Sequence, residues 1–304
     1  MKKVLILGGY GFIGTHLAQS YNEEGYEVFK TSRYLKINPR DKQSFQSDYS
    51  ENSFINIFEK YNFDLVFFLS GNPYPGISEN NSIYDIHETL VPLINLLNSL
   101  NKTKFQGSLW YASSVAVYGK TMNKFQSEND KCNPLSSYAI TKYTGEEYLK
   151  LYARNHDISC GSFRIFSTFG EGLKRQIVYD LYIKAINENP KLEIFGTGEE
   201  KRDLCYVKDQ VNRIKLLSKN LRPFGDIYNV GNGTSISSHE IALEILKITN
   251  IDKEIVFSES LRNFDGYQWT ACTKKFEKVE RNPITDLSTA LQATIKSYSQ
   301  EDIK

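Results

Sequence analysis

The chain has 304 residues, and its 37 Lys and Arg against 36 Asp and Glu leave a formal net charge of +1. A chain of this length can bury a large core in one main domain and also form a smaller one. The balanced charge argues against nucleic acid or an anionic membrane as the partner, and no apolar run approaches the length of a membrane span.

The first predicted elements are a strand, a glycine-rich turn and a helix. Val4–Leu7 is an apolar run typical of a buried parallel strand, and apolar residues at helical spacing follow the turn. Between them the glycines read G-x-x-G-x-x-G, at Gly8, Gly11 and Gly14. Such glycines allow a tight turn, close approach of the backbone to a pyrophosphate, and close packing of helix on strand. The pattern predicts a dinucleotide site, with a plain glycine turn as the alternative.

The second predicted strand, from Tyr26 to Thr31, ends without a carboxylate. A carboxylate at that point would accept hydrogen bonds from the adenosine ribose of NAD. The chain has Ser32 and Arg33 instead, and a guanidinium can pair with a 2′-phosphate. We therefore expect NADP(H) to be favoured, with NAD(H) as the alternative cofactor. The competing explanation for Arg33 is an ordinary solvated loop arginine.

A further cofactor contact is expected at Asp48, whose carboxylate could accept a hydrogen bond from the adenine amino group. Capping of the next helix is an equally good explanation of this aspartate. That helix is predicted over 51–61, with Ile55 among its inward-facing residues. A buried strand over 64–69 follows it, and its loop lies at the sheet edge where such folds bind ligands.

The pattern that carries chemistry lies further along the chain. A strand over 109–112 delivers Ser113 and Ser114 to the same edge of the sheet, and a serine-capped helix begins with Tyr138 in its first turn. Lys142 lies four residues later on the same helical face. An ammonium there can stabilise a phenolate, and a serine hydroxyl can hold and polarise a carbonyl or alkoxide oxygen.

Together these motifs resemble the extended short-chain dehydrogenase/reductases, and within them the nucleotide-sugar epimerase/dehydratase group. The resemblance covers nearly the whole chain. It implies that Tyr138 is the catalytic acid/base, that Lys142 is its electrostatic partner and that Ser114 is the catalytic serine. For the Tyr–Lys pair taken alone, chance adjacency on an amphipathic helix is the alternative.

The resemblance also implies two sets of binding residues. The predicted cofactor contacts are Gly8, Gly11, Phe12, Ile13, Gly14, Ser32, Arg33, Asp48, Tyr49, Leu69, Ser70, Gly71, Tyr138, Lys142 and Phe166. The predicted substrate contacts are Ser113, Ser114, Tyr138, Ser167, Arg202, Arg262 and Asp265. The two arginines would bind the diphosphate, and a plain surface charge is the alternative for each.

Departures from the family pattern restrict the reaction. Dehydratases of the group carry an Asp-Glu pair after the catalytic residue, but here Val115 and Ala116 stand there and cannot transfer protons. Ser167 and Asp85 replace two asparagines that usually contact the substrate, which leaves the identity of the sugar open. The expected chemistry is therefore confined to one carbinol carbon.

We accordingly expect an NADP(H)-dependent 4-keto reductase of a nucleotide-diphosphate sugar. One alternative is a nucleotide-sugar C4 epimerase with tightly bound NAD, and another is a non-catalytic NADP(H)-binding module. Reduction is preferred because of Arg33, since a reductase must exchange its cofactor and NADPH is the usual cellular reductant. Relatives often dimerise, so a homodimer is one assembly to consider.

The predicted fold class is α/β, a Rossmann-type doubly wound parallel sheet with a smaller interleaved α/β substrate lobe. The cofactor domain is expected over 1–167 with returning segments at about 205–232, and the substrate lobe over 168–204 and 233–304. The four cysteines have no Cys-x-x-Cys spacing and no metal-ligand spacing is present, so no metal is expected. The first residues do not read as a signal peptide, so the expected location is the cytoplasm.

Overall fold

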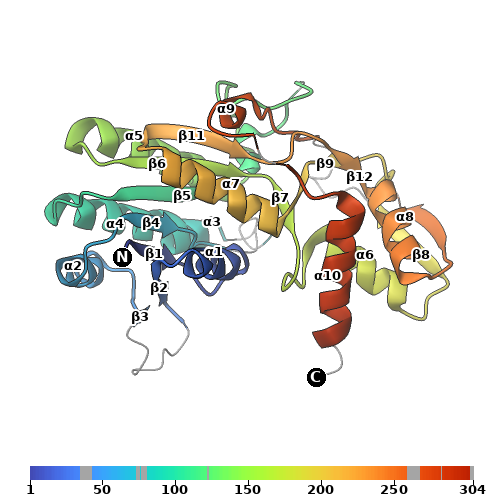
Figure 1. Ribbon diagram of the computed structural model, residues 1–304. Coiled ribbons are helices and arrows are strands. Elements are labelled where there is room, and N and C mark those ends of the chain that lie inside the picture. The colour runs from blue at the N-terminus through green and yellow to red at the C-terminus, as the bar shows by residue number, and fades with distance from the viewer. Residues whose placement is uncertain are drawn as a thin grey trace. The chain divides into compact units, whose positions relative to one another are not determined.

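The computed structural model of the protein describes residues 1–34, 43–72, 76, 81–121, 123–258, 268–281 and 283–301. Its largest sheet has seven strands in the order β11-β6-β5-β4-β1-β2-β3 (Figure 1). The strands are β1 (Lys3–Leu7), β2 (Glu27–Ser32), β3 (Ser44–Gln46), β4 (Leu65–Phe68), β5 (Ser108–Ser114), β6 (Cys160–Ile165) and β11 (Phe224–Val230).

The strand order reverses at β1, which pairs in parallel with β2 on one side and with β4 on the other. The pairs β2–β3, β4–β5 and β5–β6 are also parallel. Ligands of doubly wound folds bind beyond the carboxyl ends of the strands at such a reversal. The predicted Rossmann-type fold class is therefore confirmed.

Helices follow the strands of this sheet in alternation. They are α1 (Phe12–Glu23), α2 (Glu51–Lys60), α3 (Ser82–Asp85), the π-helical turn η2 (Ile86–Leu90), α4 (Val91–Lys102), the 3₁₀ turn η3 (Val115–Tyr118), α5 (Ser137–His156) and α7 (Val207–Asn220). No helix among the described residues has the length and apolar character needed to cross a membrane.

Different helices cover the two faces of the sheet. Val66 and Phe68 of β4 pack in a core cluster with residues of α2, α4 and α5. Phe67, which alternates with them, contacts Tyr21 of α1, with ring centres 5.7 Å apart. The Tyr21 Oη also lies 2.8 Å from the Ser218 Oγ of α7. A strand buried on both faces needs apolar residues at successive positions, as β4 has.

Helix α2 differs in detail from its prediction. Its N-cap is Ser50, whose side chain accepts a hydrogen bond from the Ser53 N–H. Ile57 is buried on the inner face, whereas Ile55 is only half-buried. The reason is geometric, because residue 57 lies three positions after the buried Phe54 and so on the same face, while residue 55 lies about 100° away.

The helical stretch from α3 to α4 contains an irregularity. Pro92, close to the start of α4, has no N–H to donate to the carbonyl of Glu88 four residues earlier. Immediately before it the chain forms the π-helical turn η2. Such turns are rare in α-helices and are often located at functional sites.

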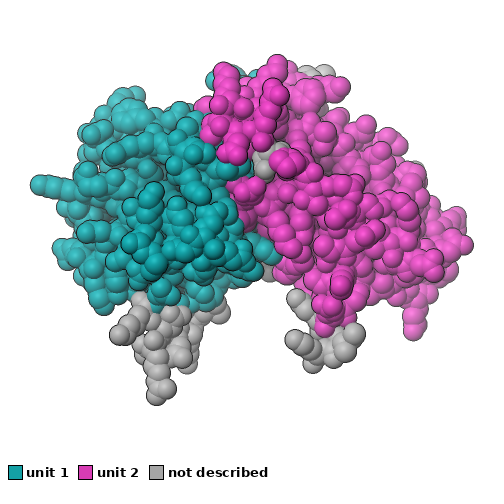
Figure 2. Space-filling model, viewed as in Figure 1, with its two compact units in different colours: residues 1–119, 128–165, 213–228 teal, residues 120–127, 166–212, 229–304 magenta. Residues whose placement is uncertain are grey.

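The chain divides into two compact units, shown in different colours in Figure 2. The first comprises residues 1–119, 128–165 and 213–228, and the second 120–127, 166–212 and 229–304. Compared with the expected domain ranges, residues 120–127, 166–167, 205–212 and 229–232 fall in the second unit. The substrate-binding role expected for this second part stays a prediction.

The second unit is built from short strand pairs and helices. Its elements are β7 (Ser167–Phe169), α6 (Gln176–Ile186), β8 (Lys191–Phe195), β9 (Lys201–Arg202), β10 (Leu204–Tyr206), β12 (Ile236–Ser237), α8 (Ser238–Thr249), β13 (Glu254–Ser258), α9 (Lys274–Glu277) and α10 (Leu287–Glu301). β8 and β13 pair in parallel, as do β7 and β10. Helix α8 begins with a capping box formed by Ser237 and Glu240.

Candidate active site

The glycine turn between β1 and α1 is as tight as its sequence predicts. Gly8 has a φ of +81°, which favours glycine, and a Cβ at Gly14 would lie 2.3 Å from the Gly8 carbonyl oxygen. The N-cap of α1 is Gly11, which has no side chain to cap the helix, and the first turn carries no acidic residue. The first N–H groups of α1 therefore have no capping side chain and lie at the positive end of the helix dipole.

This turn fits a dinucleotide pyrophosphate. The chain approaches itself so closely that glycine is required at Gly8 and Gly14, and the helix N-terminus offers donors to an anion. The loop after β4 lies against the same turn, because a Cβ on Gly8 would come 2.9 Å from the Ser70 backbone nitrogen. The predicted contacts Phe12, Ile13, Leu69 and Gly71 belong to these two segments.

The predicted catalytic residues lie at the carboxyl edge of β5 and at the start of α5. Ser136 caps α5 by accepting a hydrogen bond from the Ala139 N–H, so Tyr138 falls in the first turn and is half-buried. Ser114 ends β5, and its hydroxyl oxygen accepts a hydrogen bond from the Ala116 N–H at 3.2 Å. The hydroxyl can still donate its proton to another group.

Lys142 is buried beneath the tyrosine, with only 6 % of the residue exposed. Its Nζ donates to the Ala112 carbonyl at 2.7 Å. The same Nζ lies 5.0 Å from the ring centre of Tyr111 and 5.7 Å from that of Tyr138. Burial lowers the pKa of Lys142 to about 8, while the negative charge of Asp85 acts in the opposite direction.

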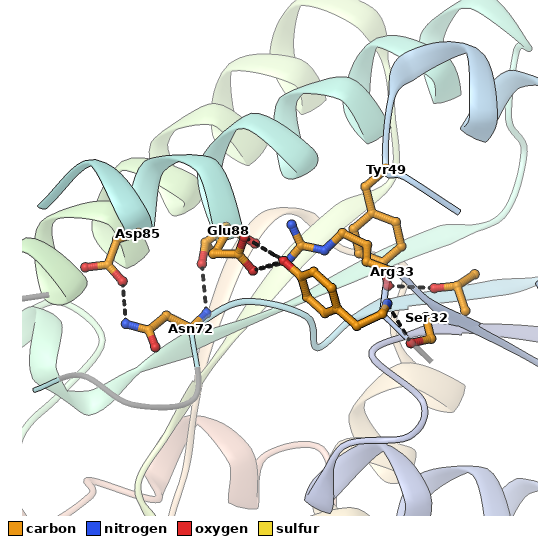
Figure 3. Close-up of polar contacts among 9 residues, drawn as sticks. Ser32, Arg33, Tyr49, Asn72, Asp85 and Glu88 are labelled. Carbon is orange, nitrogen blue, oxygen red and sulfur yellow. Dashed lines mark hydrogen bonds and ion pairs between the residues drawn. The ribbon is translucent and has the colours of Figure 1, made fainter. Parts of the chain in front are cut away.

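Asp85 is the acidic residue whose charge raises the pKa of Lys142, and its side chain is fully buried. One carboxylate oxygen accepts a hydrogen bond from the Asn72 Nδ2 at 2.9 Å (Figure 3). Its other oxygen has no hydrogen-bond partner among the described residues. From the sequence, Asp85 replaces a usual asparagine and leaves the sugar open. The structure adds that the buried carboxylate raises the pKa of Lys142 against the effect of burial.

Ser113 also differs from its predicted role as a substrate contact. It is buried, and its hydroxyl donates to the Glu146 Oε1 at 2.5 Å. The Glu146 carboxylate in turn accepts two hydrogen bonds from Arg164, at 2.9 and 2.7 Å. The Arg164 guanidinium lies 4.6 Å from the ring centre of Tyr118. This buried ion pair between α5 and β6 fixes the strand end that carries Ser114.

Arg33, the residue that favoured NADP(H), is already paired in the structure. Its Nη2 lies 2.6 Å from the Glu88 Oε2 and also donates to the Glu88 carbonyl oxygen at 3.1 Å (Figure 3). The Tyr34 hydroxyl donates to the same carboxylate. The guanidinium lies 4.9 Å from the ring centre of Tyr49, and Ser32 accepts a hydrogen bond from the Tyr34 N–H.

The two residues expected near adenine have different surroundings. Asp48 is exposed and accepts a hydrogen bond from the Ser50 N–H, which lowers the pKa of its carboxyl. Asp48 therefore forms a local turn ahead of α2, whereas the cap of that helix is Ser50 and not Asp48. Tyr49 is 2 % exposed, and its hydroxyl lies 2.7 Å from the Thr31 Oγ1. The ring of this buried tyrosine packs against the Arg33 guanidinium, whose carbon lies 4.9 Å from the ring centre.

Three predicted residues belong to the second unit. Phe166 is buried and its N–H donates to the Val230 carbonyl, Ser167 begins β7, and Arg202 ends β9. Asp203, next to Arg202, binds backbone N–H groups of residues 232, 233 and 271 and so ties three segments together. Arg262 and Asp265 lie outside the described residues.

Comparison with known proteins fits this geometry. The sequence profile of the NAD dependent epimerase/dehydratase family matches residues 4–231. The chain belongs to this family. The predicted resemblance is thereby confirmed, and with it the prediction that the protein is an enzyme of the epimerase/dehydratase type.

Similar members of the family carry more than one activity. A Methanocaldococcus jannaschii protein provisionally named a UDP-glucose 4-epimerase is 28 % identical over 96 % of this chain and 97 % of its own length. An Escherichia coli dTDP-4-dehydro-6-deoxyglucose reductase is 29 % identical over 77 % and 78 % of the two chains. The solved UDP-glucuronic acid 4-epimerase of Bacillus cereus, in complex with UDP-glucuronic acid and NAD, is 23 % identical with a TM-score of 0.86, covering 98 % and 99 %.

Sequence reasoning missed the residues that pair with the motif residues. Glu88 lies 55 positions after Arg33. The one nearby feature of the sequence that could have pointed to an irregular helix at Glu88 is Pro92, which interrupts an otherwise helical pattern. Glu146 lies four residues after Lys142 on α5, a spacing that places it on the same helical face and was a usable signal. For Arg164, the only hint of a buried ion pair in the sequence is that a charged residue stands in an otherwise apolar strand.

The glycine turn gives the first prediction. We expect Gly14→Ala to weaken dinucleotide binding at least about tenfold, or about 1.4 kcal/mol, because its Cβ would lie 2.3 Å from the Gly8 carbonyl oxygen. Calorimetric titration with NAD⁺ measures this loss. The control is Gly25→Asn, where a Cβ meets nothing within 4 Å and asparagine tolerates the φ of +79°. Unchanged affinity of Gly14→Ala for NAD⁺ would show that the glycine turn is not part of the cofactor site.

The pKa of Lys142 gives the second prediction. A lysine whose pKa falls from 10.5 unfolded to about 8 folded binds more protons when unfolded, so its contribution to stability rises with pH between these two values. The free energy of unfolding of the natural chain should therefore gain about 3 kcal/mol over that of Lys142→Met across this interval. Denaturant unfolding at pH 7.5 to 10.5 measures the difference, and a difference independent of pH would contradict the burial of a titrating ammonium.

Proposed function

We propose that the protein is a nucleotide-sugar C4 epimerase that works with a tightly held NAD. The observation that carries the proposal is the arrangement of Tyr138 over the buried Lys142 on α5, next to the strand end that bears Ser114. The M. jannaschii relative, which aligns over nearly the full length of both chains, supports it. So does the B. cereus neighbour, which was solved with a UDP-sugar and NAD.

In this proposal the residues of the chain handle the proton and the oxygen. Tyr138, stabilised as a phenolate by the Lys142 ammonium, takes the proton from the C4 hydroxyl and becomes a neutral phenol. It later returns this proton to the C4 oxygen and is a phenolate again. Ser114 donates a hydrogen bond to the C4 oxygen when it becomes a carbonyl. A bound NAD would supply a reversible acceptor for the C4 hydride. Inversion of C4 would then require only that the hydride return to the opposite face of the sugar, with no net oxidation or reduction.

Epimerisation is preferred over reduction because the argument from Arg33 is weakened. The sequence favoured a reductase on the ground that Arg33 would hold a 2′-phosphate. That guanidinium is already paired with the Glu88 carboxylate, at 2.6 Å, so its charge is compensated within the protein. Without this support for NADPH, we prefer the alternative, an epimerase that retains NAD. The M. jannaschii relative matches 96 % of this chain, whereas the E. coli reductase matches 77 % of it.

A reductase is the second candidate, and one observation favours it. The E. coli dTDP-4-dehydro-6-deoxyglucose reductase matches this chain at 29 % identity. In that reaction Tyr138 would only donate a proton, to the oxygen of a 4-keto sugar, and the spent cofactor would have to leave after each turnover.

Substrate assays distinguish these candidates. The purified protein would be given UDP-glucose, UDP-glucuronic acid and dTDP-4-keto-6-deoxyglucose, each with and without NADPH, and the products followed by NMR. Conversion of a hydroxy sugar to its C4 epimer without consumption of NADPH is the expected result. Stoichiometric oxidation of NADPH by the keto sugar would establish the reductase, and no turnover of any substrate would leave a cofactor-binding module.

Tyr138→Phe gives the third prediction. Loss of the phenol should lower turnover at least about a hundredfold, as expected when a general acid/base is removed, with the unfolding temperature little changed. Tyr143→Phe is the matched control, since Tyr143 lies one position after Lys142 on the same helix, and it should retain most of the activity. A near-normal rate in Tyr138→Phe would refute the proposed mechanism.

A further inference from the structure

The residues at the end of β2 form a closed polar cluster with the turn η2. Glu88, from η2, receives a hydrogen bond from Arg33 at the end of β2 (Figure 3). It also receives hydrogen bonds from the hydroxyl of the next residue, Tyr34. The Arg33–Glu88 pair is largely withdrawn from solvent, with 11 % and 13 % of the two side chains exposed. Ion pairs removed from water in this way are screened little by salt and are costly to break.

The backbone of η2 strengthens the hold on Arg33. Since Pro92 has no N–H for the Glu88 carbonyl, that oxygen lacks its usual α-helical donor, and the Arg33 Nη2 donates to it at 3.1 Å. The same Nη2 lies 2.6 Å from the Glu88 carboxylate. One nitrogen of the guanidinium is therefore bound by both the main chain and the side chain of a single residue.

Aromatic rings fix the plane of the guanidinium. The Arg33 guanidinium carbon lies 4.9 Å from the ring centre of Tyr49 and 5.2 Å from that of Tyr34. Tyr49 is itself held by its hydroxyl contact with Thr31 at 2.7 Å. Arg33 is thus positioned on three sides, and it cannot turn toward a new anion without losing several contacts.

The charge balance of this cluster bears directly on the cofactor. Arg33 follows the strand end at which a Rossmann-type fold reads the adenosine ribose, and an arginine there would normally favour a 2′-phosphate, which carries a charge of about −2. Here that phosphate would compete with the Glu88 carboxylate for Arg33 and would be repelled by it. A ribose hydroxyl meets no such repulsion, and a carboxylate can accept further hydrogen bonds from it.

We infer that Glu88 is the specificity-determining residue that makes the site select NAD(H) over NADP(H), in place of an acidic residue at the end of β2. The inference deepens the proposed function and shares one premise with it, namely that the glycine turn binds a nicotinamide dinucleotide. It concerns binding alone, so it can hold or fail whichever reaction the enzyme catalyses.

Glu88→Gln tests the inference, since it removes the negative charge and keeps the size of the side chain and a hydrogen-bond acceptor. The affinities for NAD⁺ and NADP⁺ are measured by calorimetric titration of protein stripped of cofactor, without any sugar nucleotide. The natural chain should bind NAD⁺ at least about tenfold more tightly than NADP⁺, a difference of about 1.4 kcal/mol. Glu88→Gln should shift this ratio toward NADP⁺ at least about tenfold, mainly through tighter binding of NADP⁺.

Two further variants separate this effect from a structural one. Glu24→Gln removes a carboxylate that pairs with Lys215 at 2.6 Å, at the far end of α1, and should leave the ratio unchanged. Arg33→Met combined with Glu88→Gln should lose most of the gain in NADP⁺ affinity, because the cation that receives the phosphate is gone. Melting curves of all variants check that the fold persists.

Two results would overturn the inference. One is a natural chain that binds NADP⁺ as tightly as NAD⁺ or more tightly. The other is a folded Glu88→Gln variant with an unchanged ratio of the two affinities. If neither cofactor binds the natural chain, the protein has no dinucleotide site, and both the inference and the proposed function are wrong.

Discussion

The burial of the Lys142 ammonium is the constraint on which this active site depends. A charged amine removed from water loses most of its hydration, and the protein offsets this only in part, through the Ala112 carbonyl, two tyrosine rings and the nearby charge of Asp85. The remaining imbalance lowers the pKa of the lysine to about 8. A cation held in this state gains by having a second negative charge nearby, and a phenolate at Tyr138 would supply it.

Two ion pairs near the site compensate their charges within the protein. The buried Glu146–Arg164 pair holds the end of β5 from below, and the Arg33–Glu88 pair connects the end of β2 to η2. Glu88, which lies 55 positions further along the chain, neutralises Arg33 at the end of β2. The charge that each motif residue presents at the sheet edge therefore depends on these partners as well.

This division explains what the sequence could and could not predict. The glycine turn, the strand that ends at Ser114 and the helix that begins at Tyr138 depend on local spacing, and their positions agree with expectation. Arg33 was placed correctly but interpreted without Glu88, because a contact across 55 positions leaves no periodic signal. Ser113 was expected to face the substrate, yet β5 alternates and turns its side chain inward to Glu146. Ile57 replaced Ile55 on α2 because only the former shares a face with Phe54.

The central claim of the proposed function is that a tyrosine next to a buried lysine moves only the hydroxyl proton, while the hydrogen on C4 leaves and returns as a hydride without exchange with solvent. A UDP-sugar labelled with deuterium at C4 tests this most directly. The account predicts that the C4 epimer formed by the enzyme retains the deuterium at C4, even in ordinary water, and that turnover is slower than with the unlabelled sugar. Exchange of the label for solvent hydrogen during epimerisation would contradict the account.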